Sequence, residues 1–248
     1  MPAVVAWLRA FAAAVTRERE YLTELDAAIG DADHGINMAR GSQAVVDKLA
    51  TAVEAVAGVA AEAEAGGNVG GAAGGGRCDG GVGDGGVGDG LGPLLKTIGM
   101  TLVSTVGGAA GPLYGTLFLA MGSAAGEARE LSLADWTAAL EAGVAGVQAR
   151  GKAEPGDKTM LDALLPAVGA LRSAAASGSS LEAALQSSAA AARQGMKATV
   201  ALVARKGRAS YLGERSAGHQ DPGATSSWLL LQTAAETLAG EGPHGTPP

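Results

Sequence analysis

Three aspartates near the N-terminus are spaced in a way that could hold a metal ion. They are Asp26, Asp31 and Asp33, in the run DAAIGDADHGIN at positions 26–37. On an unbroken helix Asp26 and Asp31 would point well apart, because each residue turns the chain by about 100°. A break at Gly30 would let the three carboxylates converge. Converging carboxylates repel one another unless a cation lies between them, and an all-oxygen ligand set favours Mg²⁺ or Ca²⁺ over zinc.

A helix expected to resume at Gly35 would add a site for an anion beside these aspartates. Its first N–H groups have no partner within the helix and favour negative charge. A metal ion next to an anion at a helix start indicates a nucleotide phosphate. The alternative is that Asp31 and Asp33 only cap the helix. Asp26, the flanking glycines and the motifs further along the chain favour the metal site.

The segment STVGGAAGPLYG at positions 104–115 places small residues and hydroxyls just before a helix start expected at Pro112. The missing side chains allow a ligand to approach the backbone, and the hydroxyls of Ser104 and Thr105 can bond phosphate oxygens. No Gly-Lys-Ser/Thr follows, so this is not a Walker P-loop. A tight crossing of two helices explains the small residues equally well.

The segment GKAEPGDKTM at positions 151–160 is a polar turn that enters another helix. Lys158 and Thr159 could bind a phosphate, and Met160 could pack against a purine. Taken alone, the segment favours a simpler interpretation, a capped helix start with a solvated lysine.

The segment RKGRASYLGER at positions 205–215 carries four cations within eleven residues of an otherwise acidic protein, and HQDPGA follows at 219–224. Arginine forks suit phosphate oxygens, so this cluster predicts an anionic partner. A solvated loop is the alternative. The glycines, Ser210 and Tyr211 within the run, and the Pro-Gly turn after it, favour a shaped loop.

Helical periodicity recurs along the chain, without a convincing run of alternating β-type residues. The short breaks that carry Gly, Pro or Asp are typical of an up-and-down helical bundle. The first helix should turn Trp7, Leu8, Phe11 and Val15 inward. The expected helices are Ala3–Ala28, Ile36–Ala65, Leu94–Thr105, Pro112–Glu127, Leu133–Arg150, Thr159–Ala176, Leu181–Val203 and Ser226–Leu238.

Composition excludes several classes of protein. A net charge of −7 argues against a general nucleic-acid binder, because there is no excess of cations to neutralise phosphates. The single cysteine, Cys78, excludes an internal disulfide and fits a reducing compartment. The apolar start Ala3–Val15 is interrupted by Arg9 and lacks the pattern of a signal peptide or membrane span. We therefore expect a cytoplasmic protein.

Residues 66–92 are more than half glycine and contain the tandem pentapeptides GGVGD at 80–84 and 85–89. So few side chains cannot offset the entropy of ordering the backbone, which predicts a flexible surface loop. The pattern has little in common with nine-residue calcium-binding repeats. Because motifs lie on both sides of the loop, we expect one domain over residues 1–239, followed by a disordered tail at 240–248 that includes His244.

The four motif blocks, in this order, resemble the L subunit of dihydroxyacetone kinase, which holds the nucleotide of that enzyme. The resemblance spans residues 1 to about 239 and implies a closed barrel of eight antiparallel helices, with the nucleotide site in the loops at one end. It implies that Asp26, Asp31 and Asp33 hold two Mg²⁺ ions. The positions that match nucleotide contacts are His34, Gly35, Ile36, Asn37, Ser104, Thr105, Gly151, Met160, Arg208, Asp221, Pro222 and Gly223. The long glycine loop and Ala110, which stands where a serine is common, depart from the family pattern.

The resemblance also implies a reaction and its partners. A phosphoryl group would pass from Mg²⁺-bound nucleotide to dihydroxyacetone held on a separate K subunit. In one branch of the family ADP stays bound and is recharged by a phosphocarrier M subunit of the sugar phosphotransferase system; in the other ATP exchanges freely. A chain that ends near residue 248 favours the first branch. The remaining expectations are a homodimer without a nucleic-acid or membrane partner, and two alternative roles stay open: an ADP-loaded module that binds a transcription factor, and a bundle whose metal is only structural.

Overall fold

The structure is a computed structural model that describes residues 1–65 and 90–238, with only the backbone of residues 52–65. Most of the predicted glycine loop, Cys78 and the predicted tail lie outside the described residues. Positions 90–92, expected to end that loop, instead begin a helix, with Gly90 as its N-cap residue. No described helix is long and apolar enough to cross a membrane.

All regular structure in the described residues is helical, which confirms the predicted all-α class. The elements are α1 (Pro2–Arg17), α2 (Arg19–Ile29), α3 (His34–Ala65), α4 (Leu91–Thr105), α5 (Ala110–Ala125), α6 (Leu133–Gly151), α7 (Leu161–Ala176), α8 (Leu181–Ala198), the 3₁₀ helices η1 (Thr199–Ala201) and η2 (Arg208–Ser216), and α9 (Pro222–Thr237).

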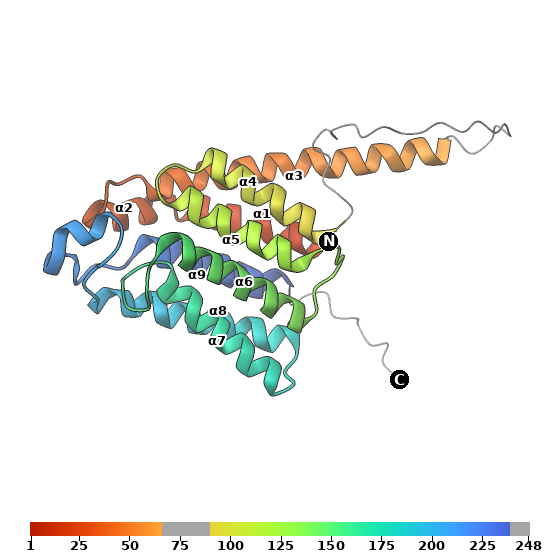
Figure 1. The fold of residues 1–248 in the computed structure, drawn as a ribbon. Coiled ribbons are helices and arrows are strands. Elements are labelled where there is room, and N and C mark those ends of the chain that lie inside the picture. Colours follow the sequence, from red (N-terminus) through yellow and green to blue (C-terminus); the bar gives the residue numbers. More distant parts are fainter. Residues whose placement is uncertain (66–89, 239–248) are drawn as a thin grey trace.

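Eight of these helices form a closed ring. Each of α3 to α8 packs against the next α-helix in chain order, and α1 closes the ring by packing against both α9 and α3. Helix α2 packs against α3, α9 and η2. The turns before α5 and α7, the long connection before α9 and the connection between α2 and α3 all lie at one end of the barrel (Figure 1). The up-and-down topology therefore gathers four of the predicted motifs at that end.

Helix α1 contributes large apolar side chains to the core of the barrel. Trp7, Leu8, Phe11 and Val15 are all buried, as their spacing predicted. The Trp7 ring meets Trp136 edge-on at 5.1 Å between centroids, and its indole N–H donates to the carbonyl oxygen of Leu230. Such aromatic pairs, and the burial of their large apolar surfaces, stabilise the packing of the helices around the barrel core.

Three further differences from the predicted helix boundaries affect the site end of the barrel. The helix expected over Ala3–Ala28 is divided at Glu18, and the division lets its second half, α2, contact η2 at the site end. The helix expected to run to Val203 ends at Ala198, because the backbone carbonyls that follow bind a buried lysine described below. The Pro-Gly turn is the first turn of α9, which Asp221 caps.

Candidate functional site

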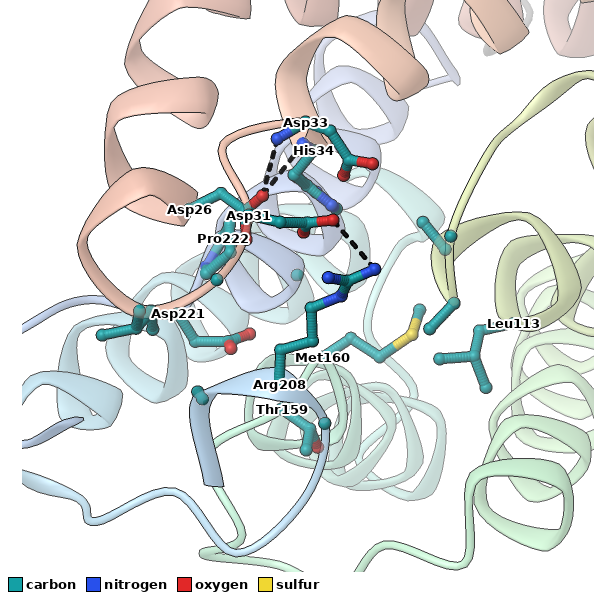
Figure 2. A pocket seen from close by; sticks show the side chains of 18 of the residues that line it. Asp26, Asp31, Asp33, His34, Leu113, Thr159, Met160, Arg208, Asp221 and Pro222 are labelled. Carbon is teal, nitrogen blue, oxygen red and sulfur yellow. Dashed lines mark hydrogen bonds and ion pairs between the residues drawn. The ribbon is translucent and has the colours of Figure 1, made fainter. Parts of the chain in front are cut away.

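A pocket opens at the end of the barrel where the four motifs meet (Figure 2). Its walls come from the α2–α3 connection, the turn before α5, the start of α7, the basic segment and the start of α9. The lining residues are Asp26, Ile29, Gly30, Asp31, Asp33, His34, Asn37, Gly107, Gly108, Ala109, Ala110, Leu113, Tyr114, Lys158, Thr159, Met160, Lys206, Gly207, Arg208, Ala209, Asp221, Pro222 and Gly223.

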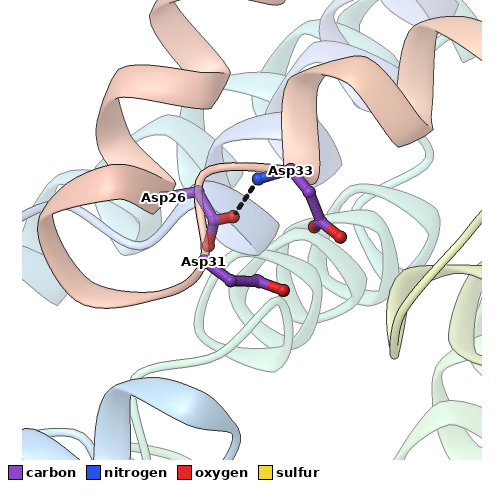
Figure 3. Close-up of side chains that lie close together, drawn as sticks. All are labelled: Asp26, Asp31 and Asp33. Atoms are coloured by element: carbon purple, nitrogen blue, oxygen red, sulfur yellow. Dashed lines mark hydrogen bonds between the residues drawn. The ribbon is translucent and has the colours of Figure 1, made fainter.

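The three aspartates converge on one wall of this pocket (Figure 3). One carboxylate oxygen from each of Asp26, Asp31 and Asp33 lies within 4.8 Å of the others. Helix α2 ends at Ile29, so the chain reverses before Asp31. Ala32 then adopts a left-handed φ of 61°, a strained conformation for a residue with a Cβ. Such strain is typical of functional sites.

Two glycines make this reversal possible. A Cβ at position 30 would lie 2.0 Å from Oδ1 of Asp26, and one at position 35 would lie 2.0 Å from the carbonyl oxygen of Arg19. Neither space admits a methyl group. Gly30 therefore leaves the Asp26 carboxylate in place, and Gly35 lets the start of α3 approach α2.

The start of α3 binds Asp26 rather than Asp31 or Asp33. The backbone N–H groups of Asp33 and His34 donate to Oδ2 of Asp26 at 2.9 and 3.1 Å. In the part of the chain that the structure describes, the side chains of Asp31 and Asp33 accept no hydrogen bond from this helix start. Their carboxylates face the pocket instead, so helix capping does not explain them.

The donor set of this cluster fits a hard divalent cation. All candidate ligand atoms are carboxylate oxygens, the set that suits Mg²⁺ or Ca²⁺. The two backbone N–H groups occupy Oδ2 of Asp26 and leave Oδ1 available. The cationic neighbour of the cluster is Arg208, whose Nη2 lies 2.9 Å from Oδ2 of Asp31. One guanidinium cannot balance three carboxylates, and a divalent ion would neutralise the remaining charge.

Arg208 reaches the aspartates from a loop that carries the basic segment, residues 202–219, here named the Arg208 loop. Ala204 and Ala209 of this loop form a small buried cluster with Ile29 at the end of α2, and Leu212 packs against it. The apolar contact places the loop beside the α2–α3 connection. It explains how Arg208 can pair with Asp31 although its side chain is 65% exposed.

Lys158 is not the solvated lysine that its segment alone favoured. The residue is 1% exposed, and its ammonium donates to the carbonyl oxygens of Thr199, Leu202 and His219. Burial lowers the pKa of Lys158, whereas the negative charge of Asp221 raises it. The N-cap residue of α7, Met160, makes no side-chain cap, and Asp162 in the first turn instead accepts from the backbone N–H of Thr159 at 2.7 Å.

His34 is fixed by a chain of hydroxyl groups. Its Nε2 lies 2.9 Å from Oγ of Ser226, which accepts from the Tyr114 hydroxyl and donates to the carbonyl oxygen of Gly223. A serine has one proton to donate, so His34 Nε2 carries the proton in this network and Nδ1 is left as an acceptor. Burial lowers the pKa of His34 despite the charges of Asp26 and Asp33, and burial raises the pKa of Tyr114 to about 12.

Asp221 caps α9 from a buried position beside the pocket. Its Oδ2 accepts from the backbone N–H of Ala224 at 2.6 Å. Burial raises the pKa of Asp221 to about 7; the Ala224 hydrogen bond and Lys158 oppose the rise, and the charges of Asp162 and Asp26 add to it. The free carboxylate thus costs folding energy at neutral pH.

We expect Asp221→Asn to stabilise the nucleotide-free, metal-free protein at pH 8 but not at pH 4. The folded-state pKa lies above the ordinary value of 3.8, so the folded protein retains a proton that the unfolded chain loses, and stability falls as pH rises from about 4 to 7. The amide can keep the cap while abolishing this loss. The expected gain at pH 8 is on the order of 1–3 kcal/mol. Urea unfolding at both pH values measures it, and an equal effect at pH 4 and pH 8 would contradict the assignment.

The predicted nucleotide contacts divide into two groups. Seven line the pocket: His34, Asn37, Met160, Arg208, Asp221, Pro222 and Gly223. Five do not: Gly35, Ile36, Ser104, Thr105 and Gly151. The Ile36 residue is 52% exposed, and the hydroxyls of Ser104 and Thr105 both donate to the carbonyl oxygen of Thr101.

The small residues of segment 104–115 serve both interpretations that the sequence allowed. A Cβ at Gly111 would lie 2.2 Å from the carbonyl oxygen of Val106, and one at Gly115 would lie 2.2 Å from Val103, so these two glycines permit the α4–α5 crossing. The four residues between Val106 and Gly111 line the pocket instead: Gly107, Gly108, Ala109 and Ala110.

The sequence predicted Met160 as a purine contact but did not predict Leu113, its neighbour in the apolar wall of the pocket. Leu113 and Met160 lie together on the side away from Asp31 (Figure 2). Leu113 lies in segment 104–115, where the sequence assigned it no role. Its position one turn after Ala110 is the one feature that could have predicted a place in the pocket. Tyr114 and Lys206 also line the pocket without having been predicted to do so.

Comparisons with known proteins relate the chain to one family. The family described as the DAK2 domain matches residues 83–236. The ADP-binding subunit of the PEP-dependent dihydroxyacetone kinase of Escherichia coli K12 is 40% identical over 232 residues, which cover 94% of each chain. The ADP-binding subunit of the PTS-dependent dihydroxyacetone kinase of Lactococcus lactis is 37% identical over 95% of this chain and 96% of its own.

The solved structures show the same fold within a longer chain. The dihydroxyacetone kinase of C. freundii matches with a TM-score of 0.62 at 23% identity, over 94% of this chain and 34% of its own. Its complex with AMP-PNP and Mg²⁺ matches with the same TM-score at 22% identity.

Proposed function

The chain belongs to the DAK2 domain family, and on that premise we propose that it is the nucleotide-binding subunit of a dihydroxyacetone kinase. It would bind ADP or ATP with two Mg²⁺ ions and pass a phosphoryl group to dihydroxyacetone held on a separate K subunit. The whole described barrel would act as one domain in this role.

The observation that carries the proposal is the convergence of three carboxylates beside a helix start and an arginine. Asp26, Asp31 and Asp33 present oxygens within 4.8 Å of one another, at the wall where Arg208 enters the pocket. Phosphoryl transfer needs charge neutralisation and in-line positioning more than covalent help from the protein. This arrangement supplies both types of charge that a polyphosphate and its metal ions require.

The metal ions would be held by Asp26, Asp31 and Asp33. When bound, Mg²⁺ neutralises charge on the phosphates and orients the terminal phosphoryl group. The protein's own groups would do the rest: Arg208 has N–H donors beyond the one aimed at Asp31, and these suit phosphate oxygens. The backbone of Gly107 and Gly108, without Cβ atoms, can approach the ligand closely.

The nucleotide base would lie against the apolar wall. Met160 and Leu113 offer a polarisable sulfur and a methyl surface for a purine face. His34, Asn37, Asp221, Pro222 and Gly223 also line the pocket and are proposed as further contacts. The five predicted residues outside the lining, Gly35, Ile36, Ser104, Thr105 and Gly151, remain proposals that depend on the resemblance alone.

The names of the relatives support one source of the phosphate. Four bacterial relatives that match over 92–96% of their length, at 37–40% identity, are named ADP-binding subunits of PEP- or PTS-dependent dihydroxyacetone kinases. This supports a retained ADP that a phosphocarrier M subunit recharges. Two erythrulose kinases of Mycolicibacterium smegmatis are 32–33% identical, with the match covering 35% of their length. Erythrulose is therefore the alternative acceptor to test.

Reconstitution tests the proposal. The purified chain is mixed with a K subunit and dihydroxyacetone, and either ATP or phosphoenolpyruvate with the phosphocarrier relay is added. Dihydroxyacetone phosphate is measured by coupled reduction, with erythrulose as a second acceptor. We expect product with the relay, and ADP that copurifies with the chain. Product with ATP alone would identify the exchanging branch, and no product from either source would overturn the proposal.

A further inference from the structure

Lys158 stands apart from the other basic residues near the pocket. It is 1% exposed, and its backbone has a left-handed φ of 63°, which a residue with a side chain rarely adopts. Gly156, two positions earlier, also has a positive φ, of 86°. The turn thus adopts a strained backbone conformation that directs the Lys158 side chain inward.

The Lys158 ammonium has no donor left for a ligand. It carries three N–H groups, and three backbone carbonyl oxygens accept from it: Thr199 at 2.7 Å, Leu202 at 3.1 Å and His219 at 2.5 Å. Although Lys158 lines the pocket, it cannot hydrogen-bond a phosphate without releasing one of these carbonyls. The direct phosphate contact that its sequence motif allowed is therefore replaced by another role.

The three carbonyls flank the Arg208 loop. Leu202 begins this loop and His219 ends it, so a single ammonium ties the two ends together. Neighbouring backbone bonds close the same gap: Gly218 N–H donates to the carbonyl oxygen of Val200 at 2.7 Å. Arg205 N–H donates to that of Asp157, the residue before Lys158, at 3.1 Å.

The two ends of the Arg208 loop lie close together, and the chain between them includes the 3₁₀ helix η2. Within the loop, Ala204 N–H donates to the Ser216 hydroxyl at 2.8 Å, and the buried side chains of Ala204 and Ala209 pack against Ile29 of α2. The loop delivers Arg208 to Asp31. Movement at the tied ends would move the guanidinium as well.

We propose that Lys158 is a positioning residue that closes the Arg208 loop over the pocket and thereby slows nucleotide release. The hydrogen bonds of Lys158 support the closure of the loop, and the effect of closure on nucleotide release rests on the proposed function. Retention of nucleotide then depends on a residue that makes no hydrogen bond to it.

Hydrogen exchange in the nucleotide-free protein tests the closure itself. In Lys158→Met, the amides of Arg205 and Gly218 should exchange at least tenfold faster than in the parent, while amides in the middle of α5 keep their protection. The matched control is Lys197→Met, an exposed lysine near the end of α8. Faster exchange everywhere would report global unfolding, and Lys158→Gln, whose amide can keep one or two of the carbonyls, then serves in its place. Unchanged exchange at Arg205 and Gly218 would overturn the closure.

Nucleotide release tests the consequence and separates it from a general loss of stability. Release of ADP in the presence of Mg²⁺ should be at least tenfold faster in Lys158→Met than in the parent. If Lys158 acts through the Arg208 loop, the double variant with Arg208→Ala should release ADP little faster than Arg208→Ala alone. Effects that multiply in the double variant would overturn the proposed coupling. If the parent chain binds no ADP, the proposed function is refuted. Faster amide exchange at Arg205 and Gly218 in Lys158→Met would still support the role of Lys158 in closing the loop.

Discussion

Asp33→Asn is expected to abolish Mg²⁺-dependent retention of nucleotide while the chain stays folded. Asp33 is the informative choice, because Asp31 also pairs with Arg208 and Asp26 also binds the start of α3. Loss of a direct ligand should weaken Mg²⁺-dependent ADP binding by more than the roughly 10–100-fold that removal of an outer-shell partner costs. Calorimetric titration of ADP with and without Mg²⁺ measures the loss.

The same substitution should leave the metal-free protein as stable as the parent or more stable, because it removes one of three mutually repelling charges. Asp47→Asn is the matched control, since Asp47 is an exposed aspartate on α3 whose side chain accepts a hydrogen bond from Gln43. A loss of ADP binding that is equal with and without Mg²⁺ would show that Asp33 contacts the nucleotide and does not hold the metal.

The fold could be predicted because its signals are local. The helical periodicity and the short Gly- or Pro-bearing breaks are visible in windows of a few turns, and they fix an antiparallel ring in which alternate connections share an end. The break at Glu18 carries no such signal, since neither Gly nor Pro occurs there. It depends on the contact of α2 with η2, which a local pattern does not contain.

The convergence of the aspartates could also be expected from local sequence, because the three lie within eight positions and Gly30 and Gly35 bracket the last two. The role of Lys158 could not be predicted from local sequence. Its carbonyl partners lie 41, 44 and 61 positions further along the chain, and a lysine gives no sequence signal for a left-handed backbone. A sequence window therefore shows a polar turn with a lysine, and only the closed ring shows what surrounds it.

The His34 network has the same origin. Ser226 lies 192 positions from His34 and 112 from Tyr114, and the barrel brings the three side chains together where α3, α5 and α9 begin. The motifs marked which segments meet at the site. The partner that orients His34 and Tyr114 is a serine of α9, Ser226, and nothing in the local sequence of α9 distinguishes it from an ordinary helical serine.

Arg208→Ala should change the affinities for nucleotide and for Mg²⁺ in opposite directions. If the guanidinium binds phosphate oxygens, its removal should weaken ADP binding by roughly 1.5–3 kcal/mol, the range for a hydrogen bond to a charged group. In the absence of nucleotide, the same arginine neutralises Asp31 at 2.9 Å and competes with a cation for that oxygen. Its removal should therefore strengthen binding of Mg²⁺ alone, by about 0.2–1 kcal/mol because the pair is exposed.

Two further variants sharpen this test. Arg208→Lys should recover only part of the ADP affinity, since an ammonium lacks the planar fork of a guanidinium. Arg205→Ala is the matched control: its side chain is exposed and forms no ion pair within the described residues, so it should change neither affinity appreciably. The measurements are titrations of ADP at saturating Mg²⁺ and of Mg²⁺ alone. Equal small losses of ADP affinity at both arginines would mean that the basic cluster is only a solvated face, and a weaker Mg²⁺ site in Arg208→Ala would show that the arginine organises the carboxylates and does not compete for them.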